Sequence, residues 1–281
     1  MSYGTVAVLA VDALRDHGAV LIALALSEAE SMHLDIHCLA LETTLPEAVF
    51  TGSVIPVIWS DHVIAMERAA QLEKQLQPLV APDRRNVQFC GQQLRGRGFA
   101  DNLRRILRFA DWTVMTAPHH QSDDPALQTA MLEATLVAGR PPVIVVPEGC
   151  PEMPSTPNRL AVAWDGSREA LAAIRGALPM LRRARLVDVV VVDPDMRHGD
   201  RSDPGGDLAL FLLRHGAQVE INVLSRSRPK ISDVLKCHVS NTGAEAMVMG
   251  ALGHSRLREK LFGGTARDML TDPPIPLILA R

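Results

Sequence analysis

Ten short runs of aliphatic residues recur along the chain, and each has the length of a β-strand. Five lie in the first half, at Val6–Val11, Leu34–Leu41, Val87–Gln92, Trp112–Ala117 and Val143–Val146. Five lie in the second half, at Leu160–Trp164, Leu186–Val192, Val219–Leu224, Ala246–Gly250 and Leu277–Ala280. Helix-like stretches or loops separate them, and this alternation is typical of βαβ units. The predicted fold class is therefore α/β with parallel strands.

The segments between the strands of the second half have helical periodicity. Over Ala170–Leu178 the apolar residues fall on one helix face, and Pro179 is expected to end or kink that helix. A second helix is predicted at Asp207–His215, with Gly216 as its C-terminal cap. A third is predicted at Ser232–Val239, with its serine at the N-cap position.

The two halves repeat each other in register. The segment Ala110–Pro118 aligns with Ala244–Leu252, 134 residues later, and the same spacing carries Pro142 onto Pro276. A repeat of domain size indicates duplicated domains rather than a solenoid. We predict one domain over residues 1–150 and another over residues 158–281, joined by a proline-rich linker at Glu148–Asn158.

Composition narrows the classes of function. Hydrophobic residues make up 47% of the chain and aromatic residues 4%, and the formal net charge is −3. We therefore expect no nucleic-acid role, including for the arginine-rich stretch Arg68–Arg108, which lacks a series of stacking aromatics. No apolar run approaches the roughly 20 residues that span a bilayer, and we expect no secretion signal, because Met1–Gly4 is not a basic segment followed by an apolar one and a cleavage site. The four cysteines form no C-x-x-C pair, so a cytoplasmic protein with reduced thiols is expected.

A glycine pattern in the second half carries the main chemical signal. Gly250 and Gly253 follow a predicted strand, and after nine further residues Gly263, Gly264 and Thr265 open the last predicted helix. Glycine permits a positive φ and a close approach of phosphate, and a helix N-terminus offers unpaired N–H donors. The two anchors together predict a phosphate cradle, although each glycine pair taken singly could serve only a turn.

A second part of the predicted binding site is an Asp-Gly-Ser tripeptide at the end of the first strand of the second half. Asp165 could accept hydrogen bonds from a ribose or a nucleobase, Gly166 provides a tight turn, and Ser167 is a natural helix cap. Taken alone, the tripeptide could also be nothing more than a helix start. Its combination with the glycines at matching strand ends favours a binding site.

These motifs resemble those of the universal stress protein family. The likeness rests on Ala163–Ser167 and on Met249–Glu259, followed by Gly263–Thr265 at the family's spacing, and it covers Arg159–Arg281 well. It implies that the phosphates of a nucleotide are held by Gly250, Gly253, His254, Gly263 and Gly264. It further implies that Asp165 lies beside the ribose or adenine and that the backbone near Val191 contacts the adenine.

The resemblance also implies a fold and a ligand. We expect two tandem Rossmann-like domains, each a five-stranded parallel sheet flanked by helices, and a stress-response protein that binds ATP, with Mg²⁺. ATP-binding members have Ser or Thr directly after the last glycine, whereas this chain has Gly264 there and Thr265 one residue later. Losing one hydrogen bond to a charged group costs roughly 1.5–3 kcal/mol, so weaker binding is expected.

The first half lacks the glycine pattern. In register, Thr116, His119, Thr129 and Ala130 replace Gly250, Gly253, Gly263 and Gly264. Asp12 still ends the first strand, but Ala13 and Leu14 follow it in place of glycine and serine. We expect this domain to be degenerate and structural, packed against the second as a built-in dimer partner, while the whole chain could still form a homodimer.

Two readings of the function remain. The first is a nucleotide-binding protein that is not an enzyme, because no general base or catalytic triad is recognisable, although slow ATP hydrolysis stays open. The second is a nucleotide-free interaction module of the same fold; an adenylyl-transferring enzyme is disfavoured.

We read His119, His120, Asp123 and Asp124 as a solvated loop rather than a metal site. The basic run at His254, Arg256, Arg258 and Lys260 is either solvated or contacts polyphosphate or a partner.

Overall fold

The ten predicted strands are present in the computed structural model, which describes residues 4–41, 54–94, 98–118, 125–138, 141–150, 153–154, 156–194, 203–251 and 264–281. The strands of the first half are β1 (Thr5–Ala10), β2 (His33–Leu41), β3 (Val87–Leu94), β4 (Trp112–Thr116) and β5 (Val143–Val146). Those of the second half are β6 (Arg159–Ala163), β7 (Leu186–Val192), β8 (Val219–Leu224), β9 (Ala246–Gly250) and β10 (Leu277–Ala280). The last four and β5 match the predicted bounds residue for residue, and the others shift by one or two residues.

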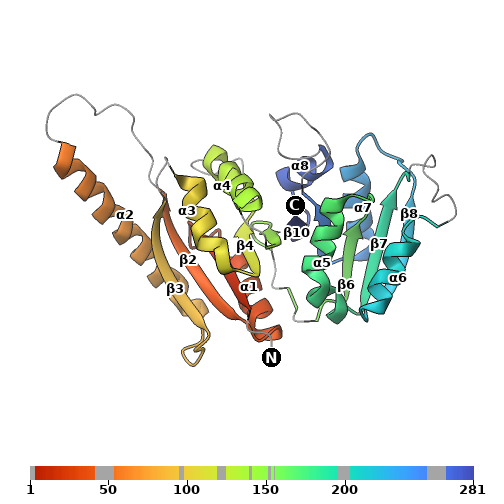
Figure 1. Cartoon of the computed structure of the whole chain (residues 1–281), viewed down its shortest axis with the longest axis horizontal. Helices are drawn as coiled ribbons and strands as arrows, with labels where there is room; N and C mark the ends of the chain where they lie inside the picture. The colour runs from red at the N-terminus through yellow and green to blue at the C-terminus, as the bar shows by residue number, and fades with distance from the viewer. Residues whose placement is uncertain are drawn as a thin grey trace.

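All ten strands belong to one sheet, which runs from end to end of the molecule (Figure 1). Its order is β3-β2-β1-β4-β5-β10-β9-β6-β7-β8. The five strands of each half are parallel, as predicted, and the halves meet where β5 and β10 pair antiparallel. The final strand of each half therefore finds its partner within the same chain.

Eight helices cover the sheet in the part of the chain that the structure describes. They are α1 (His17–Ala29), α2 (Val54–Leu76), α3 (Phe99–Ile106), α4 (Pro125–Ala138), α5 (Arg168–Arg183), α6 (Gly206–Arg214), α7 (Ile231–Thr242) and α8 (Gly264–Thr271). Helices α1, α2, α5 and α6 share one hydrophobic core with the sheet, and α3, α4, α7 and α8 share the other. The arrangement is a three-layer sandwich of helices, sheet and helices.

Both cores continue from one half into the other. Ile144 of β5 and Ile278 of β10 lie in the first core, and their neighbours Val143 and Leu279 lie in the second. Successive side chains of a strand point to opposite faces, so each central strand contributes to both cores. The apolar side chains of the β5–β10 pair are at most 7% exposed, and burying each one stabilises the fold by roughly 1.5–3 kcal/mol.

The sequence register of 134 residues recurs in the hydrogen bonds of the sheet. The amide of Thr113 donates to the carbonyl of Pro142 (3.0 Å), and the amide of Met247 donates to that of Pro276 (2.9 Å). Both pairs differ by the same 134 residues. The register match therefore reflects two copies of one structural unit.

Helices of the two halves also touch. A Cβ built on Gly176 of α5 would lie 2.9 Å from the ring of Pro142 at the start of β5, so only glycine permits this approach. Further along α5, Arg183 Nη2 lies 3.1 Å from Glu30 Oε1 at the end of α1. These contacts fix the second half against the first in addition to the strand pair.

We expected Pro179 to end or kink α5, and the helix does not end there but continues through the proline to Arg183. A proline inside a helix removes one backbone hydrogen bond and costs about 3 kcal/mol. Met180 and Leu181, directly after the proline, are fully buried in the core. Their burial offsets the cost of the proline, and sequence periodicity alone does not reveal this.

The predicted caps have mixed outcomes. Gly216 ends α6 with a left-handed φ of 89°, as expected. Ser232, however, is not the N-cap of α7, because that position belongs to Lys230 and Ser232 lies inside the first turn. The Ser232 hydroxyl instead donates to Asp268 of α8 (3.4 Å), so a tertiary contact accounts for this serine.

We predict that Gly176→Leu destabilises the protein. The added side chain must displace the Pro142 ring, and overpacking of this kind costs about 1–3 kcal/mol. Urea unfolding followed by circular dichroism measures the loss. Arg175→Leu, which adds the same residue at the neighbouring exposed position of α5, should change stability by less than about 0.5 kcal/mol. A Gly176→Leu protein that is more stable than the parent, as glycine removal from an unconstrained helix produces, contradicts the contact.

Candidate functional site

A pocket of about 260 Å³ lies in the second half at the carboxyl ends of β6, β7 and β9. Helices α7 and α8 contribute residues to its walls. Strand β6 pairs with β7 on one side and with β9 on the other, so the strand order reverses at this point. Open α/β sheets usually bind ligands at such a reversal, outside the carboxyl ends of the strands.

One side of the pocket is apolar. Its wall is formed by Val190 and Val192 of β7, Ile231 and Leu235 of α7, and Met249 of β9. Aliphatic side chains from three elements leave a slot without charge. Such a slot suits a flat, weakly polar ring better than a phosphate or a sugar.

The mouth of the pocket is formed in part by the turn between β6 and α5. Asp165 Oδ1 accepts a hydrogen bond from the amide of Ser167 (2.9 Å), and Ser167 Oγ caps α5 by accepting from the amide of Ala170 (3.0 Å). Gly166 has a φ of 76°, which favours glycine. Asp165 and Ser167 both line the pocket, so the turn holds an exposed carboxylate at its rim.

Gly250 also lines the pocket, but the reason for glycine differs from our expectation. Its φ is not positive. A Cβ at this position would lie 2.8 Å from the amide nitrogen of Ala170 and 3.2 Å from the carbonyl carbon of Glu169. The first turn of α5 therefore packs directly on the end of β9. Glycine is required here by helix packing, whatever the pocket binds.

The start of α8 closes another side of the pocket. Gly264 and Thr265 are its first two residues, and both line the pocket. The first turn carries no acidic residue, so its unpaired N–H groups and positive dipole end remain suited to an anion. A Cβ on Gly264 would meet nothing within 4 Å. A side chain introduced at Gly264 would therefore be tolerated by the fold.

Five of the ten residues predicted to bind a nucleotide line this pocket. They are Asp165, Ser167, Gly250, Gly264 and Thr265. Gly166 shapes the turn beside it without lining it. Gly253, His254 and Gly263 lie outside the described residues, as do Arg256, Arg258 and Lys260 of the basic run.

The remaining predicted residue, Val191, was expected to contact the adenine through its backbone, and its side chain points away from the pocket. It is 6% exposed in the core on the opposite face of the sheet, whereas its neighbours Val190 and Val192 line the pocket. Strand alternation predicts that these two valines share a face. Trp164, which also lines the pocket, was missed because a residue at a strand end carries no periodic signal.

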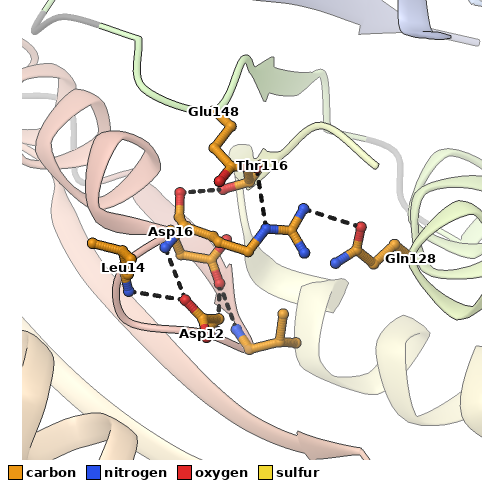
Figure 2. A network of polar contacts seen from close by, with 8 residues as sticks. Asp12, Leu14, Asp16, Thr116, Gln128 and Glu148 are labelled. Atoms are coloured by element: carbon orange, nitrogen blue, oxygen red, sulfur yellow. Dashed lines mark hydrogen bonds and ion pairs between the residues drawn. The ribbon is translucent and has the colours of Figure 1, made fainter. Parts of the chain in front are cut away.

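At the corresponding strand ends of the first half, side chains of the chain itself form a network of polar contacts (Figure 2). The Arg15 guanidinium lies 3.3 Å from Glu148 Oε2 and 3.3 Å from Gln128 Oε1. Thr116, the register equivalent of Gly250, donates its hydroxyl to the carbonyl of Arg15 (3.4 Å). The turn after β1 is thus tied to the end of β4, to α4 and to the segment after β5.

A buried acidic side chain belongs to the same network of polar contacts. Asp16, 3% exposed, accepts hydrogen bonds through Oδ2 from the amides of Val11 (2.6 Å) and Asp12 (2.9 Å) at the end of β1. Burial raises the pKa of Asp16 above its ordinary value, although the hydrogen bonds from Thr116 and the two amides oppose the rise. A carboxyl oxygen of the chain itself therefore accepts hydrogen bonds from the amides at the end of β1.

Solved structures with this fold are known. A universal stress protein from Archaeoglobus fulgidus matches with a TM-score of 0.66 and 15% identity, over 98% of this chain and 98% of that one. A protein from Pseudomonas aeruginosa, provisionally described as a universal stress protein, matches with a TM-score of 0.59 and 14% identity, over 99% of this chain and 93% of that one. This chain has the universal stress protein fold.

A third structure, of a functionally unknown protein from Pseudomonas aeruginosa, matches equally well, with a TM-score of 0.59, 14% identity, and coverage of 99% of this chain and 92% of that one. No protein-family model and no curated protein matches the sequence. At these identities the likeness to universal stress proteins concerns the fold alone, so function has to be argued from the site.

Two classes of feature are not found in the described ranges. No helix there is long and apolar enough to cross a membrane. No group of three or more His, Cys, Asp or Glu side chains there could hold a metal ion. His119, His120, Asp123 and Asp124, which we read as a solvated loop, fall outside these ranges.

Gly250→Val is predicted to destabilise this universal stress protein fold whether or not a ligand is present. The valine would collide with the backbone of α5, and the cost should be about 1–3 kcal/mol. Gly264→Val, by contrast, should leave the thermal midpoint of the ligand-free protein nearly unchanged. Differential scanning fluorimetry compares the two variants. Equal midpoints would show that Gly250 is not a packing position.

We predict a pH-dependent effect of Asp16→Asn. Because the pKa of Asp16 in the folded protein is raised above its ordinary 3.8, the folded state binds more protons than the unfolded state above about pH 4, and this residue lowers stability as pH rises. Asparagine cannot ionise, so the variant should gain stability relative to the parent between pH 4 and 8. Urea midpoints across this range test the prediction. A constant difference between the two proteins contradicts it.

Proposed function

We propose that this protein is a universal stress protein that binds an adenine nucleotide, ATP above all, in the pocket of its second half. One observation supports this most. Residues from three distant segments, at the ends of β6 and β9 and at the start of α8, line a single pocket together with an apolar slot. A nucleotide needs an apolar surface for its base, a polar group for its sugar and N–H donors for its phosphates, and this pocket combines all three.

The residues present fit such a ligand. The base would enter the slot between Val190, Val192 and Leu235. The ribose hydroxyls would be near the Asp165 carboxylate, and the phosphates would be held by the N–H groups that open α8 at Gly264 and Thr265. ATP bound with Mg²⁺ supplies the negative charge for which that helix end is suited.

The pocket supports binding rather than rapid turnover. Among its described lining residues, Asp165 is the one with a carboxyl group, and its Oδ1 already accepts a hydrogen bond within the turn. A general base would have to lie within hydrogen-bond reach of an attacking water. We therefore propose a nucleotide-dependent binding protein.

A second candidate function is a nucleotide-free interaction module. Large apolar side chains exposed to solvent in the first half favour this candidate. Leu14 is 86% exposed and Phe109 is 81% exposed. Leu14 sits on a turn that is held in place because Asp12 Oδ1 accepts its amide and that of Arg15 (2.9 Å each). An exposed leucine on a hydrogen-bonded turn suits contact with another protein.

Nucleotide binding is tested by titrating the protein with Mg²⁺ and ATP, ADP, AMP or GTP while following tryptophan fluorescence and thermal stability. Trp164 lines the pocket, so ATP should change its emission, and Trp164→Phe should remove the change. A ligand at 100 times its Kd adds about 2.7 kcal/mol, a shift of several degrees.

Variants at the start of α8 separate the two candidate functions. Gly264→Val should abolish the ATP effect, and Gly264→Ser, which restores a hydroxyl, should tighten binding about tenfold or more. Ala130→Val, at the register-equivalent and exposed position of the first half, should bind ATP like the parent. A parent protein that shows no response to any nucleotide at millimolar concentration would leave the interaction module as the function.

A further inference from the structure

Helix α6 and strand β8 form the outer end of the second half (Figure 1). Large apolar side chains are exposed on both elements: Leu210 is 46% exposed, Leu213 is 51% exposed and Val223 is 50% exposed. Val223 lies on the sheet face that α6 covers, because Val219 and Ile221 of the same strand pack against the core that α6 shares. Exposed apolar side chains that gather at one end of a molecule suit contact with another protein.

The solvent-facing side of α6 has a charge at each end and leucines between them. It consists of Asp207, Leu210, Leu213 and Arg214, which are all exposed and which we call the α6 face. Asp207 and Arg214 are seven residues apart, about two helical turns, so they lie on one side of the helix. Neither of these two side chains forms an ion pair or a hydrogen bond within the described part of the chain.

The charges of the α6 face are complementary to those of a second copy. If a second α6 lies antiparallel to the first, about a two-fold axis between Leu210 and Phe211, its Arg214 is opposite Asp207 and its Asp207 is opposite Arg214. The leucines of the two copies then meet between these charge pairs. A parallel pair of helices in the same register would oppose like charges, which is unfavourable. The same patch thus serves both subunits, as a two-fold symmetric contact requires.

The edge of the sheet beside α6 is open as well. Strand β8 is the last in the strand order and pairs with β7 on one side, and no strand of the described chain pairs with its other side. Unpaired N–H and C=O groups on an edge strand favour association with another chain. A second copy on the α6 face would shield this end of the sheet from other partners.

We propose that two copies of this chain associate through the α6 face into a symmetric dimer. No residue of α6 lines the pocket at the ends of β6, β7 and β9, so the dimer forms without a nucleotide. A helix of nine residues is about 14 Å long and covers less than the roughly 800 Å² per partner that a stable interface buries. The dimer is therefore weak and reversible, with a Kd on the order of 10 μM.

The test is sedimentation velocity of the full-length protein without nucleotide, from about 1 to 200 μM. Leu213→Asp should abolish the dimer over this range, because it places an unpaired charge between the leucines. Asp207→Arg opposes like charges at both ends of the contact and should weaken the dimer about tenfold. Asp207→Arg combined with Arg214→Asp reverses both charges and should restore the Kd to within about threefold of the parent value.

Asp101 provides a matched control. It lies in the first turn of the short helix α3, as Asp207 lies in the first turn of α6, and Arg104 of its own helix donates to it (2.6 Å). Asp101→Arg should change the Kd by less than about twofold. Circular dichroism checks that every variant is folded, which is expected because the changed side chains are exposed.

Three results would overturn the proposal. The first is a parent protein that stays monomeric at every concentration. The second is a dimer that Asp207→Arg and Asp101→Arg affect equally, because the contact would then lie elsewhere on the molecule. The third is a protein with both charges reversed that associates no better than Asp207→Arg alone.

Discussion

The antiparallel pairing of β5 with β10 is the contact on which the rest of the architecture depends. It joins two parallel five-stranded sheets into one of ten strands. Each of these strands would be an unpaired edge if its half stood alone, and exposed edges invite association with other chains. The pairing is antiparallel at this junction, whereas the strands within each half are parallel to one another.

The same fold is used in two ways within the chain. In the second half, the turn after β6 is short, and its carboxylate lies at the rim of an open pocket. In the first half, the turn after β1 brings Asp16 onto the strand-end amides and Arg15 across toward Glu148. Internal polar contacts thus tie the turn after β1 to neighbouring elements, whereas the turn after β6 borders a pocket.

Helix α7 lines two pockets of the second half. Ile231 and Leu235 line the pocket at the ends of β6, β7 and β9, and Cys237 and His238 line a pocket beside β8. Residues that are four apart share a helix face, whereas those two apart do not. Helix α7 therefore separates the two pockets, which have no lining residue in common.

The sequence by itself determined the elements and their repetition. Aliphatic runs located all ten strands, because a buried parallel strand needs a continuous apolar segment, and equal spacing of Pro142 and Pro276 revealed the duplication. Glycine and acidic motifs also brought five predicted residues to one pocket. Tertiary structure alone decided the rest. Burial of Met180 and Leu181 carries α5 through Pro179, packing against α5 demands glycine at Gly250, and the sheet face decides that Val190 rather than Val191 lines the pocket. These outcomes depend on contacts between segments far apart in the chain, which local patterns do not encode.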